Sequence, residues 1–353
     1  MFNKLINRLP DIKTLSKLFL LENLPRLSNQ LSCSNFLAAC KVTENCNSKC
    51  EYCNFHKTVK KEMDFEQWVS IINQFKNNNI KYVRFTGGEP FMNPNILDLL
   101  QYSKNIGLQV SLQSNVLLLD EFKIMKLKEI GINSLSISID GTDDDYKDNR
   151  GVDGFSRVKK ICEILSRELN GIVQITPTIT DTTIKGLYKV IKFAEEVKIP
   201  VTGFSAVNMT HYFFKGDYNE NAYKSLDREE SDIFLRYLFD NYIKKHSEYC
   251  KISRLQLYTI KKYFDDFHMS DLPCIKPFYQ ICIGSTGNVY GCCSMNSIGN
   301  LNNNTLTQIM QSSNLKDVRH HALNKTCPGC SCGMNFNSKF NLKYNIDSLR
   351  YFK

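Results

Sequence analysis

The chain has 353 residues, enough for one large domain and a smaller one with an ample core. Lysine and arginine (45) exceed the acidic residues (36), giving a net charge of +9, but the basic residues are dispersed and mark no nucleic-acid-binding stripe. No apolar run has the length of a membrane span, and no secretory signal segment follows the first residues.

Fourteen cysteines are too many for an ordinary chain of this length. Most lie in an N-terminal and a C-terminal block, and several recur at spacings typical of metal ligands. We therefore expect a cytoplasmic protein whose thiols are ligands in a reducing compartment and do not form disulfides.

The chain begins with a segment, 1–32, that is expected to form one or two short helices. Residues 14–21 are largely apolar with polar breaks, which favours a lid packed on the main domain. A membrane-surface or partner-docking helix is the alternative.

Three cysteines, Cys46, Cys50 and Cys53, follow with the spacing CxxxCxxC. Three thiolates on one loop can hold three irons of a [4Fe–4S] cluster, which normally takes four cysteine ligands. With no local fourth cysteine, one iron is left open to a ligand that is not protein. A zinc site or three unrelated buried thiols are the alternatives.

About thirty residues later, a strand-like segment ends in the run Gly87-Gly88-Glu89-Pro90. Two glycines let backbone approach a ligand without a Cβ in the way, and Glu89 would place a negative charge beside an ammonium. Alone this run is typical of a turn. The run and the cysteine loop, in this order and each at the end of a strand-like segment, indicate a specific site.

Strand-like and helix-like segments alternate from about residue 36 to 208, which indicates a parallel sheet with helices outside. Strands are expected at 36–42, 80–85, 108–113, 134–139, 172–176 and 201–206, and helices include 64–77 with Asp64 as N-cap, 95–105, 120–130 and 155–168. Residues 211–265 are charged, aromatic and helical, as expected of a connector packed under this unit.

A second cysteine-rich block covers residues 274–332. Cys274 and Cys282 open it, the pair Cys292 and Cys293 follows a glycine-rich turn, and a short helix is expected near 305–311. The run 327–332 then contributes three more cysteines. Four thiolates hold zinc as well as an iron–sulfur cluster, so this pattern leaves both open.

The first cysteine loop and the Gly-Gly-Glu-Pro run together resemble the radical S-adenosylmethionine (SAM) enzymes, and the second block resembles their SPASM/twitch auxiliary-cluster extension. The resemblance implies an α/β fold: a partial, six-stranded (β/α) barrel with its site at the carboxyl ends of the strands, followed by a small cysteine-rich domain. It also implies that the open iron chelates SAM, whose cleavage gives a 5′-deoxyadenosyl radical that abstracts hydrogen from a C–H bond.

By this resemblance, Tyr52 lies against the adenine, Arg150 meets the SAM carboxylate, and Val207 borders the adenine. A fixed guanidinium fork suits a carboxylate better than lysine does. Each of these residues has a capping, turn or loop role as its alternative. The expected cofactor-binding residues are Tyr52, Gly87, Gly88, Glu89, Pro90, Ser114, Asn115, Ser138, Asp140, Arg150 and Val207.

Few cysteines follow the CxxC pair of the second block, so a single-cluster twitch form fits better than the two-cluster SPASM form. The expected auxiliary ligands are Cys274, Cys292, Cys327 and Cys330, with Cys282 and Cys332 as alternates. Cys293 stands where sulfatase-maturing relatives carry an aspartate base. It is interpreted as a spare ligand or, as in peptide epimerases, a hydrogen-atom donor.

The expected divisions are an N-terminal helical segment (1–32), the barrel (33–210), the connector (211–265) and the auxiliary domain (266–353). An auxiliary cluster suggests net oxidation, so the first hypothesis is crosslinking, epimerisation or dehydrogenation of a peptide or protein. Dehydrogenation of a sugar or aminocyclitol is the second, and a non-catalytic metal-binding or electron-carrier protein the third. A flavodoxin or ferredoxin is the expected reductant.

Overall fold

The structure is a computed structural model. It describes residues 16–17, 19–20, 36–50, 52–53, 61–180, 183–206, 228–266, 272–292, 294–327 and 341–352. Four residues of the sequence-based hypotheses, Val207, Cys293, Cys330 and Cys332, lie outside these ranges, as does most of segment 1–32. Within that segment the four described residues, 16–17 and 19–20, are helical.

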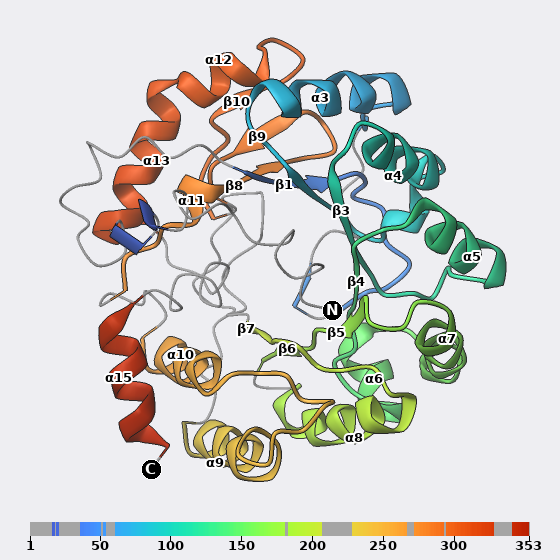
Figure 1. Cartoon of the computed structure of the whole chain (residues 1–353), viewed down its shortest axis with the longest axis vertical. Coiled ribbons are helices and arrows are strands. Elements are labelled where there is room, and N and C mark those ends of the chain that lie inside the picture. Colours follow the sequence, from blue (N-terminus) through green and yellow to red (C-terminus); the bar gives the residue numbers. More distant parts are fainter. Residues whose placement is uncertain are drawn as a thin grey trace.

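An open, mainly parallel sheet forms the centre of the molecule (Figure 1). Its strands run in the order β10-β9-β8-β1-β2-β3-β4-β5, and β1 to β5 are parallel neighbours. The expected α/β fold with a partial barrel is therefore confirmed. These five strands are β1 (Leu37–Lys41), β2 (Tyr82–Thr86), β3 (Gln109–Ser114), β4 (Ser134–Ile137) and β5 (Val173–Ile175).

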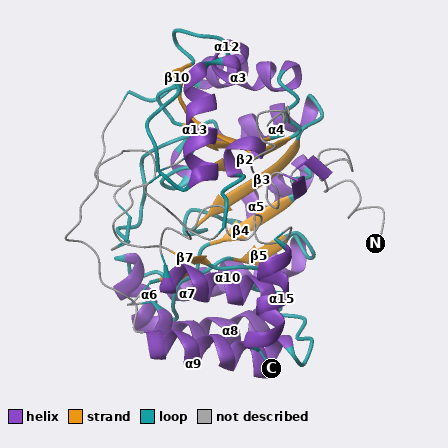
Figure 2. Ribbon diagram, turned by 90° about the vertical axis from the view of Figure 1, so that its left-hand side faces the viewer, coloured by secondary structure: helices purple, strands orange, loops and turns teal. Residues whose placement is uncertain are grey.

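Helices lie around the outside of the sheet (Figure 1), and strands β2, β3, β4 and β5 follow one below another in the view of Figure 2. Every second strand residue, such as Val83 and Phe85 of β2, is buried against helix residues such as Trp68 and Leu99. We call this the outer face. The helices after the strands are α3 (Phe65–Asn77), α4 (Ile96–Asn105), α5 (Glu121–Ile130), α6 (Asp143–Arg150), α7 (Phe155–Glu168) and α8 (Leu187–Val197).

The start of α3 agrees with the sequence in detail. Asp64 accepts a hydrogen bond from the Gln67 backbone N–H (2.9 Å), and the Gln67 side chain accepts one from the Asp64 N–H (3.0 Å). This reciprocal capping box satisfies two N–H groups that an uncapped helix leaves without partners. The N-cap predicted at Asp64 is confirmed.

The sixth expected strand, at 201–206, is wrong as a continuous element. Val201 forms only isolated bridges, to Ile175 and Cys250. Beyond it, β7 (Ser205–Ala206) pairs with β6 (Thr178–Ile179) in a separate two-stranded sheet. Pro177 and Pro200 lie beside these pairings, and proline has no N–H to continue a ladder.

The C-terminal cysteine-rich residues extend the barrel sheet, which the sequence pattern did not predict. β8 (Gln280–Ile283) pairs in parallel with the free edge of β1, so Ala39 lies opposite Cys282. β9 (Asn288–Tyr290) and β10 (Gly299–Asn300) then add antiparallel strands. One sheet therefore joins the two cysteine-rich parts of the chain.

The described part of the connector is mainly helical, as predicted: α9 (Arg228–Leu238) leads into a π-helical turn, η6 (Phe239–Ile243), and a non-helical segment then leads to α10 (Arg254–Asp265). The predicted short helix near 305–311 is also present, as α12. The remaining elements are η3 (Pro90–Met92), η4 (Ile184–Gly186), α11 (Lys276–Tyr279), α12 (Leu306–Gln311), α13 (Ser313–Asn324) and α15 (Leu342–Tyr351).

The α3 cap gives a stability prediction. Asp64→Ala removes the acceptor for the Gln67 N–H and should lower the free energy of unfolding by about 1 kcal/mol, whereas Asp64→Asn keeps an acceptor and most of the stability. Urea unfolding can be followed by the fluorescence of Trp68, the single tryptophan of the chain, whose side chain is fully buried. Equal midpoints for the two variants would contradict the role of the cap.

Candidate functional site

The cysteine loop, residues 43–53, leaves the carboxyl end of β1 and lies against the carboxyl end of β2. Backbone hydrogen bonds join them: the Gly88 N–H donates to the Thr43 carbonyl (2.8 Å) and the Glu89 N–H to the Asn45 carbonyl (2.8 Å). The pairing of β1 with β2 therefore continues into the motif that carries Cys46, Cys50 and Cys53.

Gly87 and Gly88 are required by this contact. A Cβ on Gly87 would lie 2.5 Å from the Thr43 carbonyl oxygen, and one on Gly88 would lie 2.1 Å from that of Asn45. Both distances are far inside van der Waals contact, and backbone atoms cannot turn away as a side chain can. The glycines thus allow the cysteine loop itself to approach β2, a neighbour that the sequence argument, which considered only a ligand, did not foresee.

Asn115, just after β3, holds the same loop from a second strand. Its Nδ2 donates to Asn47 Oδ1 (2.7 Å) and lies 3.1 Å from Ser48 Oγ. Its own backbone N–H donates to Glu89 Oε2 (2.7 Å). Asn47 and Ser48 were not predicted as site residues, because nothing in the sequence distinguishes the polar residues between the cysteines.

Glu89 is completely buried at the centre of this arrangement. Ser114 Oγ donates to its Oε1 (2.7 Å), and the Phe91 N–H reaches the same oxygen at 3.3 Å. Burial nevertheless raises the pKa of Glu89 to about 7, because these hydrogen bonds and the distant Arg150 charge only partly offset the loss of water. A cation placed beside this carboxylate would favour its ionised form.

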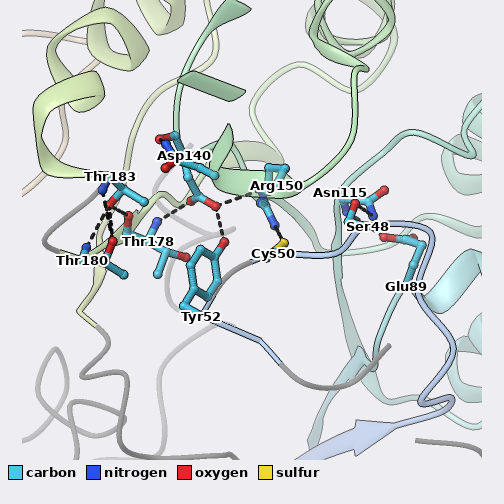
Figure 3. Close-up of polar contacts among 11 residues, drawn as sticks. Ser48, Cys50, Tyr52, Glu89, Asn115, Asp140, Arg150, Thr178, Thr180 and Thr183 are labelled. Atoms are coloured by element: carbon cyan, nitrogen blue, oxygen red, sulfur yellow. Dashed lines mark hydrogen bonds and ion pairs between the residues drawn. The ribbon is translucent and has the colours of Figure 1, made fainter. Parts of the chain in front are cut away.

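Arg150, the last residue of α6, reaches the cysteine loop from a third direction (Figure 3). Its Nη1 lies 3.5 Å from Cys50 Sγ, its Nε lies 2.8 Å from Asp140 Oδ2 as an ion pair, and its backbone carbonyl accepts from the Lys49 N–H. Its Nη2 is buried and has no hydrogen-bond partner among the described residues. One donor of the guanidinium therefore remains available for an acceptor on a ligand.

Asp140, after β4, has protein partners at both oxygens. Oδ1 accepts from the Thr178 N–H (2.6 Å), and Oδ2 accepts from the Tyr52 hydroxyl and faces Arg150 (Figure 3). In this structure Asp140 orients Tyr52 and Arg150, while Ser138 is half-buried and connects to Ser114 through its backbone. Direct contact of Asp140 or Ser138 with a cofactor stays a prediction.

The cysteine loop has the chemistry expected of a cluster site. Burial raises the pKa of the Cys46 thiol to about 12, and the nearby thiols of Cys50 and Cys53 and the Glu89 carboxylate act in the same direction. Since the Cys46 pKa is raised, ionisation of the thiol to a thiolate requires nearby positive charge, which a bound metal centre supplies. Among the residues described, no three His, Cys, Asp or Glu side chains are placed to share one metal ion.

Two of the expected auxiliary ligands, Cys274 and Cys292, flank the β8–β9 hairpin in sequence, and a third, Cys327, follows α13. Cys274 lies before β8 and Cys292 after β9. The Cys274 N–H donates to the carbonyl of Ala322 (3.2 Å), which lies two residues before the end of α13 and five residues before Cys327. Cys282, by contrast, packs with Ala39 in a small buried cluster inside the sheet. This favours Cys274, Cys292 and Cys327 over Cys282 as ligands, and their role stays a prediction.

Comparisons with known proteins agree with this geometry. A sequence model of the Radical SAM superfamily matches residues 40–194, and one of an iron–sulfur cluster-binding domain, SPASM, matches residues 274–331. An AdoMet-dependent heme synthase of Oleidesulfovibrio alaskensis is 28% identical over 180 residues, which are 50% of this chain and 46% of that protein. The chain spans about half the length of the curated relatives it matches.

Solved structures share the fold at low identity. SuiB of Streptococcus suis bound to its precursor peptide SuiA has a TM-score of 0.63 at 18% identity, covering 84% of this chain and 69% of SuiB. The protein anSMEcpe with bound AdoMet and the Cp18Cys peptide has a TM-score of 0.63 at 22% identity, covering 90% and 95% of the two chains. Separately, no helix in the described residues is long and apolar enough to cross a bilayer.

The Gly88 contact predicts a loss of cluster assembly. Gly88→Ala places a methyl group against the Asn45 carbonyl and should displace the cysteine loop, so that reconstituted protein contains about four fewer irons per chain. Gly284→Ala is the matched control, because its Cβ would meet its neighbours at an ordinary 3.6 Å. Iron analysis of both variants tests this, and full iron loading of Gly88→Ala would contradict it.

The raised pKa of Glu89 predicts a pH-dependent stability of the cluster-free protein. The pKa of Glu89 is about 7 in the folded protein and 4.5 in the unfolded chain, so folding favours the protonated carboxyl. The stabilisation of the folded state by this protonation is complete below pH 4.5 and is lost as pH rises through 7. Relative to Glu89→Gln, wild type should lose on the order of 3 kcal/mol of unfolding free energy across this range. Urea unfolding at several pH values measures it, with the exposed Glu163→Gln as control; parallel wild-type and Glu89→Gln profiles would refute it.

Proposed function

Because the chain belongs to the radical SAM superfamily and carries a SPASM-type iron–sulfur domain, we propose that it is an enzyme that oxidatively modifies a peptide or protein. Crosslinking, epimerisation and dehydrogenation are the reactions in this class. The observation that carries the proposal is the meeting of the cysteine loop, Glu89 and Arg150 at one edge of the sheet.

The cofactors of this family are a [4Fe–4S] cluster and SAM, with an auxiliary iron–sulfur cluster in the SPASM-type domain. When bound, the first cluster and SAM supply a 5′-deoxyadenosyl radical that abstracts hydrogen from a C–H bond. Cys46, Cys50 and Cys53 would hold this cluster, and Cys274, Cys292, Cys327 and Cys330 would hold the auxiliary one.

The two buried charges beside the loop suit the methionine half of SAM. Glu89 carries a carboxylate whose burial disfavours its charge, so an ammonium beside it would be stabilised and would in turn keep it ionised. Arg150 offers the buried Nη2 donor, and the SAM carboxylate is a matching acceptor. Asp140 and Tyr52 hold the guanidinium in position for this contact.

Arg150 also acts on the cluster side of the site. Its Nη1 lies 3.5 Å from Cys50 Sγ, and donors near a ligating sulfur stabilise the negative charge on that sulfur. A single side chain would thus contact both a cluster ligand and the SAM carboxylate. This arrangement would bring SAM directly against the cysteine loop.

Support for a peptide substrate comes from fold neighbours. SuiB is bound to the peptide SuiA, and anSMEcpe to the Cp18Cys peptide. The sheet that joins β1 to β8 also gives the SPASM-type domain a fixed position relative to the barrel, which suits a cluster that takes part in net oxidation. A flavodoxin or ferredoxin would supply the electron.

A small molecule is the second candidate substrate. The relative named AdoMet-dependent heme synthase matches half of this chain, and its name indicates a reaction on a small molecule. A non-catalytic role is disfavoured because Glu89 and Arg150 are both buried in place beside the cysteine loop.

The test is SAM cleavage. Protein reconstituted anaerobically with iron and sulfide, then reduced with dithionite, should convert SAM to 5′-deoxyadenosine, which mass spectrometry quantifies. The Cys46→Ala/Cys50→Ala/Cys53→Ala variant should lose at least about a hundred-fold in rate, since no cluster can bind. Addition of candidate peptides or small molecules that raise the rate then identifies the substrate class.

Two outcomes would contradict the proposal. Equal 5′-deoxyadenosine in wild type and triple variant would show that the cysteine loop does not carry the reaction. Zinc bound in place of iron, with no 5′-deoxyadenosine, would show a structural metalloprotein.

A further inference from the structure

The inner face of strands β2 to β5, opposite the outer helices, is mostly polar. Along β2 the side chains of Tyr82, Arg84 and Thr86 alternate with the buried Val83 and Phe85, so they point to this inner face. The inner positions of the next strands are hydroxyls and amides: Ser111 and Gln113 of β3, Ser134 and Ser136 of β4, and Gln174 of β5.

Arg84 is the exception in this neutral lining. Its strand neighbours at the same level are Ala39 of β1 and Ser111 of β3, and both are small. The guanidinium is therefore not covered from either side, and the side chain is exposed to solvent.

No acidic group neutralises Arg84. It forms no hydrogen bond or ion pair with any residue that the structure describes, and none of the described inner positions of β1 to β5 is Asp or Glu. The other inner cation, Lys41, is paired with Glu44 (3.1 Å). The ionisable groups that act on Arg84 are Tyr279 and Cys282, and neither is a carboxylate.

Arg84 nevertheless lies on the inner face of the sheet, on a strand that is paired on both edges, with β1 and with β3. Burial is the main influence on its pKa, which is lowered from the usual value although the side chain touches solvent. An arginine on a freely exposed outer surface has no such cause for a lowered pKa. Arg84 is thus a positive charge inside the molecule that water reaches but no described protein group balances.

We propose that Arg84 binds a carboxylate of the substrate inside the barrel. This inference rests on the proposed function only in that the substrate is expected to bind there. Arg84 lies two residues before the end of β2, about 7 Å along the strand from the edge that carries the cysteine loop. A substrate could thus anchor its carboxylate on Arg84 while its reacting carbon lies near that edge. The guanidinium fork matches one carboxylate with two parallel hydrogen bonds.

The hydroxyl and amide row beside Arg84 would bind the uncharged polar part of the same substrate. Gln174 Nε2 donates to Ser136 Oγ (2.7 Å), and Thr202 Oγ1 donates to Gln174 Oε1 (2.9 Å). These bonds hold the row in place and leave further hydrogen-bonding capacity on each group. The lining therefore suits an acidic, hydrogen-bonding substrate better than an apolar one.

The experiment uses chemical modification of arginine. Reconstituted full-length protein with SAM but no reductant is treated with phenylglyoxal at pH 8, and peptide mass spectrometry quantifies the adduct at Arg84. Glutarate at about ten times its dissociation constant should slow the modification about ten-fold, because only free Arg84 reacts. Glutaramide, its neutral analogue, should not, and Arg167, an exposed arginine on the outer helix α7, should react equally in all samples.

Further arms distinguish the source of the carboxylate. A blocked tripeptide with a central glutamate is compared with its glutamine form, and with coproporphyrin as a small molecule that bears carboxylates. Protection by the acidic tripeptide or by coproporphyrin supports the proposal and names the substrate class. Protection by inorganic phosphate alone, no protection by any carboxylate, or equal protection of Arg167 overturns it.

A binding measurement with matched variants completes the test. Isothermal titration of glutarate should give saturable heat with wild type and with Lys160→Gln, which removes an exposed cation of α7, but not with Arg84→Gln. Saturable binding to Arg84→Gln overturns the proposal. Since no reductant is present, these results do not depend on SAM cleavage, so a failure here is distinguishable from a failure of the proposed function.

Discussion

The arrangement of the site depends on one contact, the close approach of the cysteine loop to the end of β2. Two backbone hydrogen bonds join Gly88 and Glu89 to the loop, and only glycine fits at the two positions where the chains meet. Asn115 and Arg150 then reach the loop from two further directions. Because strands of a parallel sheet end at a common edge, residues far apart in sequence contact one eleven-residue segment.

The sheet separates two environments by the alternation of its side chains. Outward residues such as Phe85 pack under the helices and form the core, while inward residues such as Arg84 remain polar. The helices that follow the strands pack on the outward residues, so the polarity of the inward residues does not weaken this core. The outward residues of the strands thus determine the stability of the barrel, and the inward residues of the same strands determine its binding specificity. Substitutions in one of these two groups can leave the other group undisturbed.

Elements with local signals could be predicted from the sequence, and those that depend on distant pairing could not. Asp64 has its capping partner three residues away, so the start of α3 could be predicted from the sequence. The first five strands could be predicted as well. The sixth strand failed because Pro177 and Pro200 interrupt its ladder although its residues look like a strand. The pairing of β8 with β1 has no local signature. Within the site, motif residues were identified, but the contact of Arg150 with Cys50 depends on the fold of α6.

The pairing of β1 with β8 also has a consequence for how the protein is made. β1 emerges early from the ribosome, and its second edge is completed only by residues 280–283. Until residues 280–283 have been synthesised, that edge keeps unpaired backbone groups, and the contact between such distant segments forms slowly. The cysteine loop follows β1 directly, so its thiols are present before the sheet is closed on that side.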